Sequence, residues 1–230
     1  MKTKTFAALC CVAALFAACE KNNVGSVTGT ENGHDYVDLG LPSGLKWATC
    51  NVGATKPEEY GSYYAWGETK PQSTYNWSTY KWCNGSWNNF TKYNTRSSFG
   101  TVDNKTVLEL ADDAAAVNWG VAWRMPTDGE WGELLDECTW EWKNAYKGTT
   151  AGYLVTSKIN GNSIFLPAAG YRINGGLSLE GNDGYYWSSS LNPDYPSDPR
   201  CAWCVSFDSG RVFRGNSSRC CGQSVRAVMK

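Results

Sequence analysis

Two stretches near the middle of the chain place apolar residues at helical spacing. In the first, the apolar residues that share one helical face are Val107, Leu110, Ala111, Ala114 and Val117. Asp103 or Asn104 is suited to cap the start of this helix, and Gly120 lies just beyond its expected end. The pattern therefore predicts a helix that begins after this cap and stops before Gly120.

The second stretch carries a capping signal as well as a stripe. Thr127 and Glu130 are spaced so that the threonine side chain accepts the N–H of residue 130 while the glutamate reaches back to the N–H of Thr127. The apolar residues that follow at i, i+3, i+4 and i+7 are Trp131, Leu134, Leu135 and Cys138. We expect this helix to turn its stripe toward the core.

Short apolar fragments between turn residues predict strands on both sides of the two helices. Residues 154–159 and 163–166 flank Asn160-Gly161, which predicts a hairpin with a two-residue turn. The other expected strands lie at residues 36–39, 45–48, 185–189, 202–207, 211–213 and 224–228. This order predicts an α+β fold with two short helices, short and mainly antiparallel strands, and long loops.

The chain begins with the pattern of an export signal. Lys2 and Lys4 precede an apolar run, residues 6–18, that ends in small residues before Cys19. This segment resembles a bacterial lipoprotein signal, in which the cysteine is acylated and becomes the mature N-terminus. A membrane-spanning helix is disfavoured, since a run of this length spans only about 20 Å of the roughly 30 Å hydrocarbon layer. We expect membrane lipid to be a partner through acylated Cys19, with the protein on the periplasmic or cell-surface face of the outer membrane.

Three regions are expected along the chain. Residues 1–18 form the signal peptide, residues 19–35 are polar and form a flexible spacer, and residues 36–230 form one domain. The 21 basic and 22 acidic residues are scattered, which excludes the basic patch of a nucleic-acid binder. Because the chain holds 12 Trp and 13 Tyr, we expect its core to be built largely from aromatic rings.

Cysteine is frequent outside the signal peptide. Besides Cys19, the remaining residues are Cys50, Cys83, Cys138, Cys201, Cys204, Cys220 and Cys221. An odd number cannot all pair, and we expect at most one or two disulfides. Residues 201 and 204, like residues 220 and 221, point to opposite faces if their segments are extended, so one tetrahedral metal site cannot use all four. Buried thiols or a single bridge are favoured over a metal.

Five blocks of the sequence resemble one known family. They are residues 36–48 (YVDLGLPSGLKWA), 123–127 (WRMPT) with Glu130-Trp131, 165–172 (FLPAAGYR), 185–190 (YYWSSS) and 222–228 (GQSVRAV). In this order they resemble the Fibrobacter succinogenes major paralogous domain, common in lipoproteins of Bacteroidetes. That family is similar to the C-type-lectin-like fold, a group that includes the formylglycine-generating enzymes. The resemblance implies this fold and a surface role, and no reaction follows from it.

Catalytic and metal sites find little support in the residues. The only histidine, His34, falls in the expected spacer, so we expect no Ser-His-Asp or Cys-His site, no catalytic residue, no metal and no cofactor. The candidate carboxylates for a glycosidase are Glu58, Glu59, Asp112, Asp113, Glu130 and Glu133, and solvated or structural roles are favoured for them. Residues 180–183 (EGND) form an oxygen-rich loop with calcium-like chemistry, for which a turn is the favoured interpretation.

Aromatic residues between Tyr60 and Trp87 are the best candidates for ligand contact. Most are expected to pack in the core, and the four selected as ligand-binding are Trp66, Trp77, Trp82 and Trp87. We therefore expect a non-enzymatic envelope lipoprotein that binds a glycan or another surface macromolecule. The alternatives are a formylglycine-generating-type oxidase or glycosidase, and a structural adhesin or fimbria-associated subunit.

Overall fold

The fold is built from three antiparallel sheets, one hairpin and short helices. The computed structural model describes residues 27–192 and 199–230. The first sheet has the order β1 (Gly29–Glu31), β2 (His34–Asp38), β3 (Lys46–Asn51), β12 (Arg226–Met229). The second has the order β11 (Arg211–Ser218), β10 (Cys201–Asp208), β9 (Gly184–Leu191), and the third β4 (Cys138–Tyr146), β5 (Thr150–Ser157), β6 (Ser163–Pro167). Strands β7 (Tyr171–Ile173) and β8 (Gly176–Ser178) form the separate hairpin.

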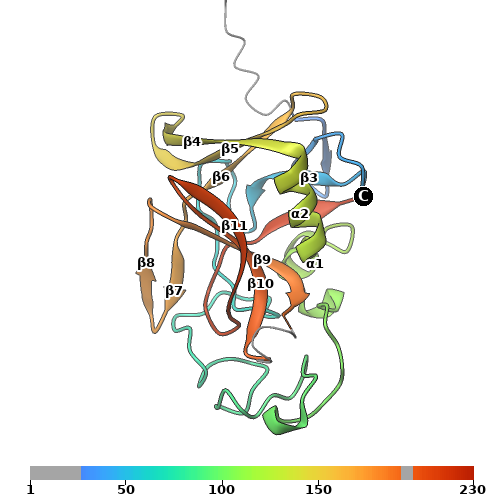
Figure 1. The fold of residues 1–230 in the computed structure, drawn as a ribbon, viewed down its shortest axis with the longest axis vertical. Helices are drawn as coiled ribbons and strands as arrows, with labels where there is room; N and C mark the ends of the chain where they lie inside the picture. Colours follow the sequence, from blue (N-terminus) through green and yellow to red (C-terminus); the bar gives the residue numbers. More distant parts are fainter. Residues whose placement is uncertain (1–26, 193–198) are drawn as a thin grey trace, which may run out of the picture.

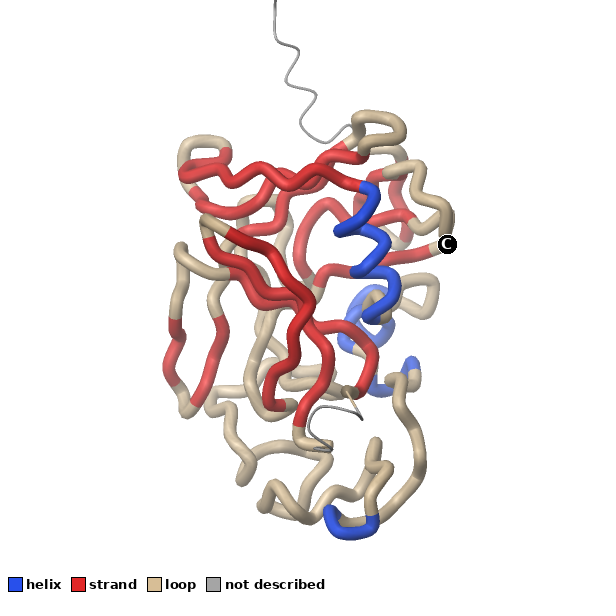
Figure 2. Tube along the Cα trace, in the orientation of Figure 1, coloured by secondary structure: helices blue, strands red, loops and turns tan. Residues whose placement is uncertain are grey.

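The helices are few and short, as predicted for an α+β fold. They are the 3-10 turns η1 (Ser97–Phe99) and η2 (Leu110–Asp112) and the α-helices α1 (Ala114–Trp119) and α2 (Asp128–Glu137). The mainly antiparallel strands confirm the expected fold class at this level. Figure 1 shows the first and third sheets toward one end of the molecule and residues 67–108 (teal to green) at the other. Figure 2 shows that this second end is built almost entirely of loop.

Helix α2 confirms its predicted cap and the stripe as far as Leu135, whereas Cys138, the last residue of the predicted stripe, begins β4. Thr127 Oγ1 accepts the N–H of Glu130 at 3.3 Å, and Glu130 Oε2 accepts the N–H of Thr127 at 2.8 Å. Glu130 also receives two hydrogen bonds from Arg124, at 2.6 and 2.7 Å. Trp131 and Leu134 are fully buried in the core. The helix is thus defined by local hydrogen bonds and by one apolar face that the core covers.

Helix α1 begins later than predicted. Residues 107–109 are not helical, and Asp113 is the cap, because its side chain accepts the N–H groups of Ala115 and Ala116. The residues expected on one helical face do not share one environment, since Val107 and Val117 are 48% and 50% exposed while residues 114–116 are buried. The predicted end is confirmed, with the N–H of Gly120 bonded to the carbonyl of Ala116.

The predicted spacer is partly wrong, because its last residues belong to the domain. Strand β1 pairs with β2 across a turn at Asn32 and Gly33, both with positive φ. The turn is tied to the core, since Asn32 Nδ2 donates to the carbonyl of Trp119 at 3.0 Å. The sheet therefore begins at Gly29 rather than at Tyr36.

The predicted export signal, residues 1–18, and the predicted acylation site, Cys19, lie outside the residues that the structure describes. Within the described ranges, no helix has both the length and the apolar character needed to cross a bilayer.

Strands β5 and β6 confirm the predicted hairpin but not its two-residue turn. Residues 158–162 form a longer connection. Asn160 Nδ2 and Asn162 Nδ2 both donate to the carbonyl of Asp38, at 3.0 and 2.8 Å, so the loop is shaped by its contact with β2. The strands expected at residues 185–189, 202–207, 211–213 and 224–228 overlap β9, β10, β11 and β12, although β11 is longer than expected and β12 begins only at Arg226.

The core is aromatic, as the composition predicted. Five tryptophans are fully buried: Trp47, Trp66, Trp123, Trp131 and Trp187. Two arginines, Arg219 and Arg226, are also fully buried. The guanidinium of Arg226 donates five hydrogen bonds, to the carbonyls of Ala48, Thr49 and Phe165 and twice to Asn51 Oδ1, at 2.8 to 3.0 Å. It thereby joins β3 of the first sheet to β6 of the third.

Candidate functional site

One continuous loop, residues 76–91, holds three of the four predicted ligand-binding tryptophans. We call it the tryptophan loop. Of its 16 residues, three are Trp, eight are Asn, Ser or Thr, and Lys81 is the only charged one. It lies in the teal part of the chain, at the end built of long loops (Figure 1). Indole rings among neutral amides and hydroxyls can stack on a ligand and hydrogen-bond to it without requiring charge.

Trp87 is the most exposed of the predicted tryptophans, with 43% of its surface accessible. The Arg200 guanidinium lies 4.6 Å from its ring centroid, and the Phe99 ring lies 6.1 Å away. Asn88 and Asn89, which follow it, are exposed. Trp87 thus presents an aromatic surface beside side-chain amides.

Trp77 and Trp82 are partly buried and are fixed by contacts with neighbouring residues. Trp82 Nε1 donates to the carbonyl of Gly67 at 2.7 Å, and Lys81 Nζ lies 4.1 Å from its ring centroid. The ring of Trp77 makes edge contacts with Tyr80 and with Phe90, at 5.7 and 5.9 Å. Both residues are of intermediate exposure, and Lys92 Nζ and the ring of Tyr93 also contact Trp82.

Trp66 is a core residue, and its prediction as a ligand contact is wrong. Its ring is 0% exposed, and its Nε1 donates to the carbonyl of Ser188 at 2.9 Å. The backbone N–H of Trp66 is bonded to the carbonyl of Arg219, which draws this segment inside. A ring covered by protein on all sides has no face left for a ligand.

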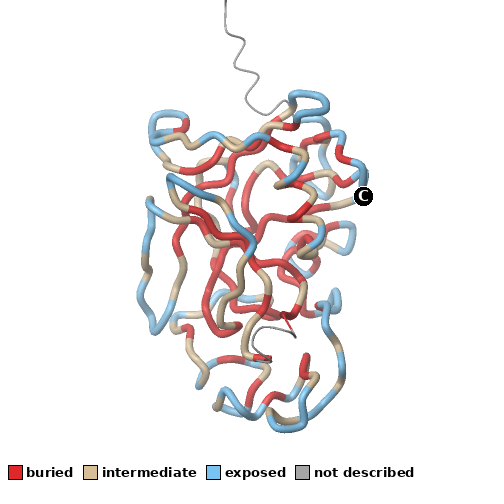
Figure 3. Tube along the Cα trace, in the orientation of Figure 1, coloured by how far each residue is buried: buried red, intermediate tan, exposed pale blue. Residues whose placement is uncertain are grey.

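The buried Arg219 holds the tryptophan loop against the body of the protein. Its guanidinium donates to Tyr80 Oη and to the carbonyls of Lys92, Tyr93 and Pro199, at 2.9 to 3.2 Å. The same group lies 4.4 Å from the ring centroid of Phe90. Figure 3 shows buried stretches (red) within this otherwise exposed end. The loop is therefore braced by internal hydrogen bonds and not only by its ends.

A buried carboxylate supports the loop from below. Glu68 is 5% exposed and accepts the N–H of Lys81 at 2.7 Å and a hydrogen bond from the Gln72 amide. Burial raises the pKa of Glu68, and the hydrogen bonds from Lys81 and Gln72 oppose that change. Its position is structural, because Oε1 accepts from the backbone of the loop and Oε2 accepts from the side chain of Gln72.

The six carboxylates considered for glycoside hydrolysis all have structural partners. Examples are Asp113, which caps α1, and Glu133, whose Oε1 accepts the N–H of Ser43 at 2.8 Å. The other four bind the following groups: Glu58 to Lys147, Glu59 to the N–H of Thr55, Asp112 to Tyr93, and Glu130 to Arg124. These contacts favour structural roles, as the sequence analysis expected.

His34 lies inside the domain, contrary to its predicted place in a spacer. It is on β2, its ring stacks on Trp119 at 3.9 Å, and it lines a hollow of about 190 Å³ together with Cys50. Burial lowers the pKa of His34, and the neighbouring Asp35 opposes that change. Burial raises the pKa of the Cys50 thiol, which donates to the carbonyl of Ala54 at 3.4 Å. A protonated thiol that faces a carbonyl is not an activated nucleophile.

Six cysteines of the described chain are buried free thiols, namely residues 50, 83, 138, 204, 220 and 221, and Cys201 is partly buried. Burial raises the pKa of Cys204 to about 12. Among the described residues, no group of three or more His, Cys, Asp or Glu side chains is placed to hold a metal ion. The cluster near the C-terminus thus contributes buried thiols to the core.

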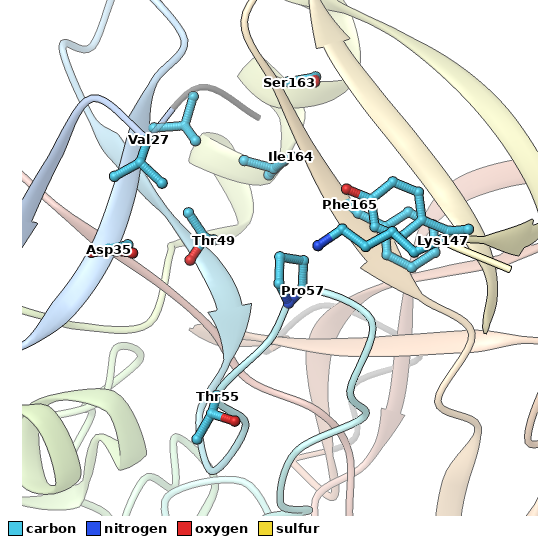
Figure 4. Close-up of a pocket in the computed structure, with 11 residues that line it drawn as sticks. Val27, Asp35, Thr49, Thr55, Pro57, Lys147, Ser163, Ile164 and Phe165 are labelled. Carbon is cyan, nitrogen blue, oxygen red and sulfur yellow. The ribbon is translucent and has the colours of Figure 1, made fainter. Parts of the chain in front are cut away.

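A further hollow, of about 220 Å³, lies between the first and third sheets (Figure 4). It is lined by Val27, Asp35, Val37, Thr49, Thr55, Pro57, Tyr146, Lys147, Ser163, Ile164 and Phe165. In Figure 4 the side chain of Lys147 extends across this space, and its Nζ binds Glu58 at 3.1 Å. Because the one cation in the hollow already has a carboxylate partner, this site offers less for recognition than the tryptophan loop.

No family model, curated protein or solved structure matches this chain. Its function is therefore argued from its own residues. Of the sites described so far, the tryptophan loop is the one that combines exposed aromatic surface, neutral hydrogen-bonding groups and a braced backbone.

Proposed function

We propose that the protein is a cell-envelope lipoprotein whose domain binds a glycan through the tryptophan loop without chemical conversion. The observation that carries this proposal is the surface chemistry of residues 76–91. Trp87 offers a ring, and Asn84, Asn88 and Asn89 are exposed amides close to it in the chain. Indole rings stack on the apolar faces of sugars, and amides match their hydroxyl groups.

The arrangement of the molecule supports the same proposal. The first described residues, near Val27, lie at one end of the long axis and the long loops at the other (Figure 1). If lipid is attached at Cys19, only seven residues separate the anchor from Val27. The tryptophan loop would then point away from the bilayer, toward ligands outside it.

The five sequence blocks further support assignment to the Fibrobacter major paralogous group and a C-type-lectin-like fold. Two of these blocks carry structural roles that suit a scaffold: residues 123–127 lead into the capping box of α2, and Arg226 joins two sheets. The buried thiols and the partnered carboxylates favour binding over the oxidase and glycosidase alternatives.

Replacing Trp87 with alanine is expected to weaken binding of the recognised glycan by about tenfold or more, which is ~1.4 kcal/mol. The loss follows from removal of the most exposed ring of the loop. A soluble chain beginning at Gly25 would be screened on a glycan array, and the affinity of its best ligand measured by calorimetry for both variants.

Phe213→Ala is the matched control, because Phe213 is 44% exposed but lies on β11, outside the tryptophan loop. It should bind like the unsubstituted chain. A blank array combined with capture of a single envelope protein would refute the glycan proposal.

Replacing Cys19 with alanine is expected to move the protein from the membrane fraction to the soluble fraction. The reason is that acyl chains, at about 0.8 kcal/mol per buried methylene, would be its only attachment to the bilayer. Fractionation and labelling with radioactive palmitate measure this directly. Full membrane retention of the alanine variant, or absence of label on the unsubstituted chain, would contradict lipid anchoring.

A further inference from the structure

A separate hollow, with a volume of about 350 Å³, lies where three distant segments of the chain meet. These segments are the hairpin of β4 and β5, the loop after β8, and the end of β10 with the turn that follows it. The residues that line it are Trp142, Asn144, Ala151, Gly181, Asn182, Asp183, Asp208 and Ser209. Figure 1 shows the three segments on the same side of the molecule, away from the tryptophan loop. The volume falls at the lower end of the range for small-molecule sites.

The indole of Trp142 forms a fixed wall of this hollow. Tyr153 and Phe207 contact its ring edge-on, with centroids 5.3 and 6.4 Å away. Its Nε1 donates to Asn144 Oδ1 at 2.8 Å, which also orients that amide. The ring is of intermediate exposure. An indole held in this way can receive the apolar face of a ligand with little loss of side-chain entropy.

Two carboxylates are held in place on the other walls. Asp208 accepts the N–H groups of Gly210 and Arg211 at 2.8 and 3.2 Å, and the Gly210 hydrogen bond together with Arg211 lowers its pKa. Asp183 Oδ2 accepts the hydroxyl of Tyr185 at 3.2 Å. Each carboxylate can accept further hydrogen bonds, since an ionised carboxylate has about four lone-pair sites.

The groups that line the hollow exclude some classes of ligand and favour others. Two carboxylates repel an anionic ligand, and the nearby cation, Arg211, is already bonded to Asp208. Two carboxylates are also too few for a typical calcium site, which takes six to eight oxygen ligands. Carboxylate, amide and hydroxyl groups around one indole instead match a ring that carries several hydroxyls.

We propose that this hollow binds one neutral sugar unit, independently of metal ions and at a position separate from the tryptophan loop. The proposal rests on the proposed glycan-binding function for its ligand class. It assigns the stacking contact to Trp142 and hydrogen bonds with sugar hydroxyls to Asn144, Asn182 and Asp183. The loop containing residues 180–183, which the sequence analysis interpreted as a turn, then also supplies part of a binding site.

The test uses the purified protein and methyl glycosides of glucose, galactose, mannose and N-acetylglucosamine, in the presence of EDTA. Saturation-transfer NMR and calorimetry should detect saturable binding of at least one. Trp142→Phe and Asn144→Ala should each weaken that binding about fivefold or more. Trp140→Phe is the matched control: Trp140 is on the same strand and also partly buried, but does not line the hollow. Its affinity should remain unchanged.

Three results would overturn this inference. They are the absence of saturable binding to any of the glycosides, equal binding by the Trp142→Phe variant, and binding that appears only when calcium replaces EDTA. Failure here is distinguishable from failure of the proposed function. If glycan binding is lost in Trp87→Ala but unchanged in Trp142→Phe, the tryptophan loop is the binding site and the hollow binds no sugar.

Discussion

Replacing Arg226 with methionine is expected to lower the free energy of unfolding by about 3–5 kcal/mol. The substitution leaves three buried carbonyls and the amide oxygen of Asn51 without the donor that now satisfies them. Burial lowers the pKa of Arg226, because an ionised group is costly to remove from water. An apolar side chain in its place would nevertheless leave the surrounding oxygens without a hydrogen-bond donor. Urea denaturation followed by tryptophan fluorescence measures the change.

Arg211→Met provides the comparison for this experiment. The side chain of Arg211 is 74% exposed, and its contacts with Asp208 and with the ring of Phe213 both lie within its own hairpin. Because exposed ion pairs contribute little, its loss should change the unfolding free energy by about 0.5 kcal/mol or less. If the Arg226 variant unfolds at the same urea concentration as the Arg211 variant, the join between the first and third sheets does not depend on the guanidinium.

Replacing Arg219 with methionine is expected to loosen the tryptophan loop and to reduce glycan binding together with it. Four oxygens lose their hydrogen bonds, three of them on residues 80–93, and the expected loss of stability is about 2–4 kcal/mol. In the Arg219→Met variant, the rate of hydrogen exchange should therefore increase in residues 76–93 at low denaturant concentration. In α2 and the sheets it should increase only at higher denaturant concentration. Mass spectrometry of peptic peptides resolves these regions.

Arg219→Lys separates charge from geometry in the same region. Lysine keeps the positive charge, but a single ammonium cannot reproduce a planar fork that contacts four oxygens and the ring of Phe90. We expect the Arg219→Lys variant to show the same increase in hydrogen exchange at residues 76–93 as the Arg219→Met variant. Unchanged exchange in residues 76–93 for both variants would show that the loop is held by its aromatic contacts alone.

Local signals in the sequence predicted those elements whose hydrogen bonds are local. The capping box of Thr127 and Glu130 closes within three residues, so its spacing alone specifies the start of α2. The expected strand at residues 202–207 likewise contains only apolar residues and small polar ones, and it coincides with β10. Strand β4 was not predicted, because the helical stripe was extended to Cys138, which is the first residue of this strand. The alternation of Trp140, Glu141, Trp142 and Lys143 between apolar and charged residues is the signal that could have identified it.

Errors arose where a distant contact overrides the local pattern. Residues 29–35 contain few apolar side chains and look like a spacer, yet they form strands because Asn32 and His34 reach Trp119. Asp103 and Asn104 are good caps by type, but Asp113 caps α1 because its carboxylate also accepts the N–H of Met125 at 2.7 Å. That third hydrogen bond comes from a segment whose position no local pattern specifies.

Periodicity and capping act within a few residues, so the amino-acid order alone predicts the α+β class, the capped helix α2, the later strands and an aromatic core. The folded arrangement was needed to learn that Trp66 is buried while Trp87 is exposed, and that Trp142, Asp183 and Asp208 line one hollow. Burial depends on which segments cover a side chain, and those segments lie far away in the chain. For the same reason the sequence does not predict the hydrogen bonds by which Arg219 fixes the tryptophan loop and Arg226 joins two sheets.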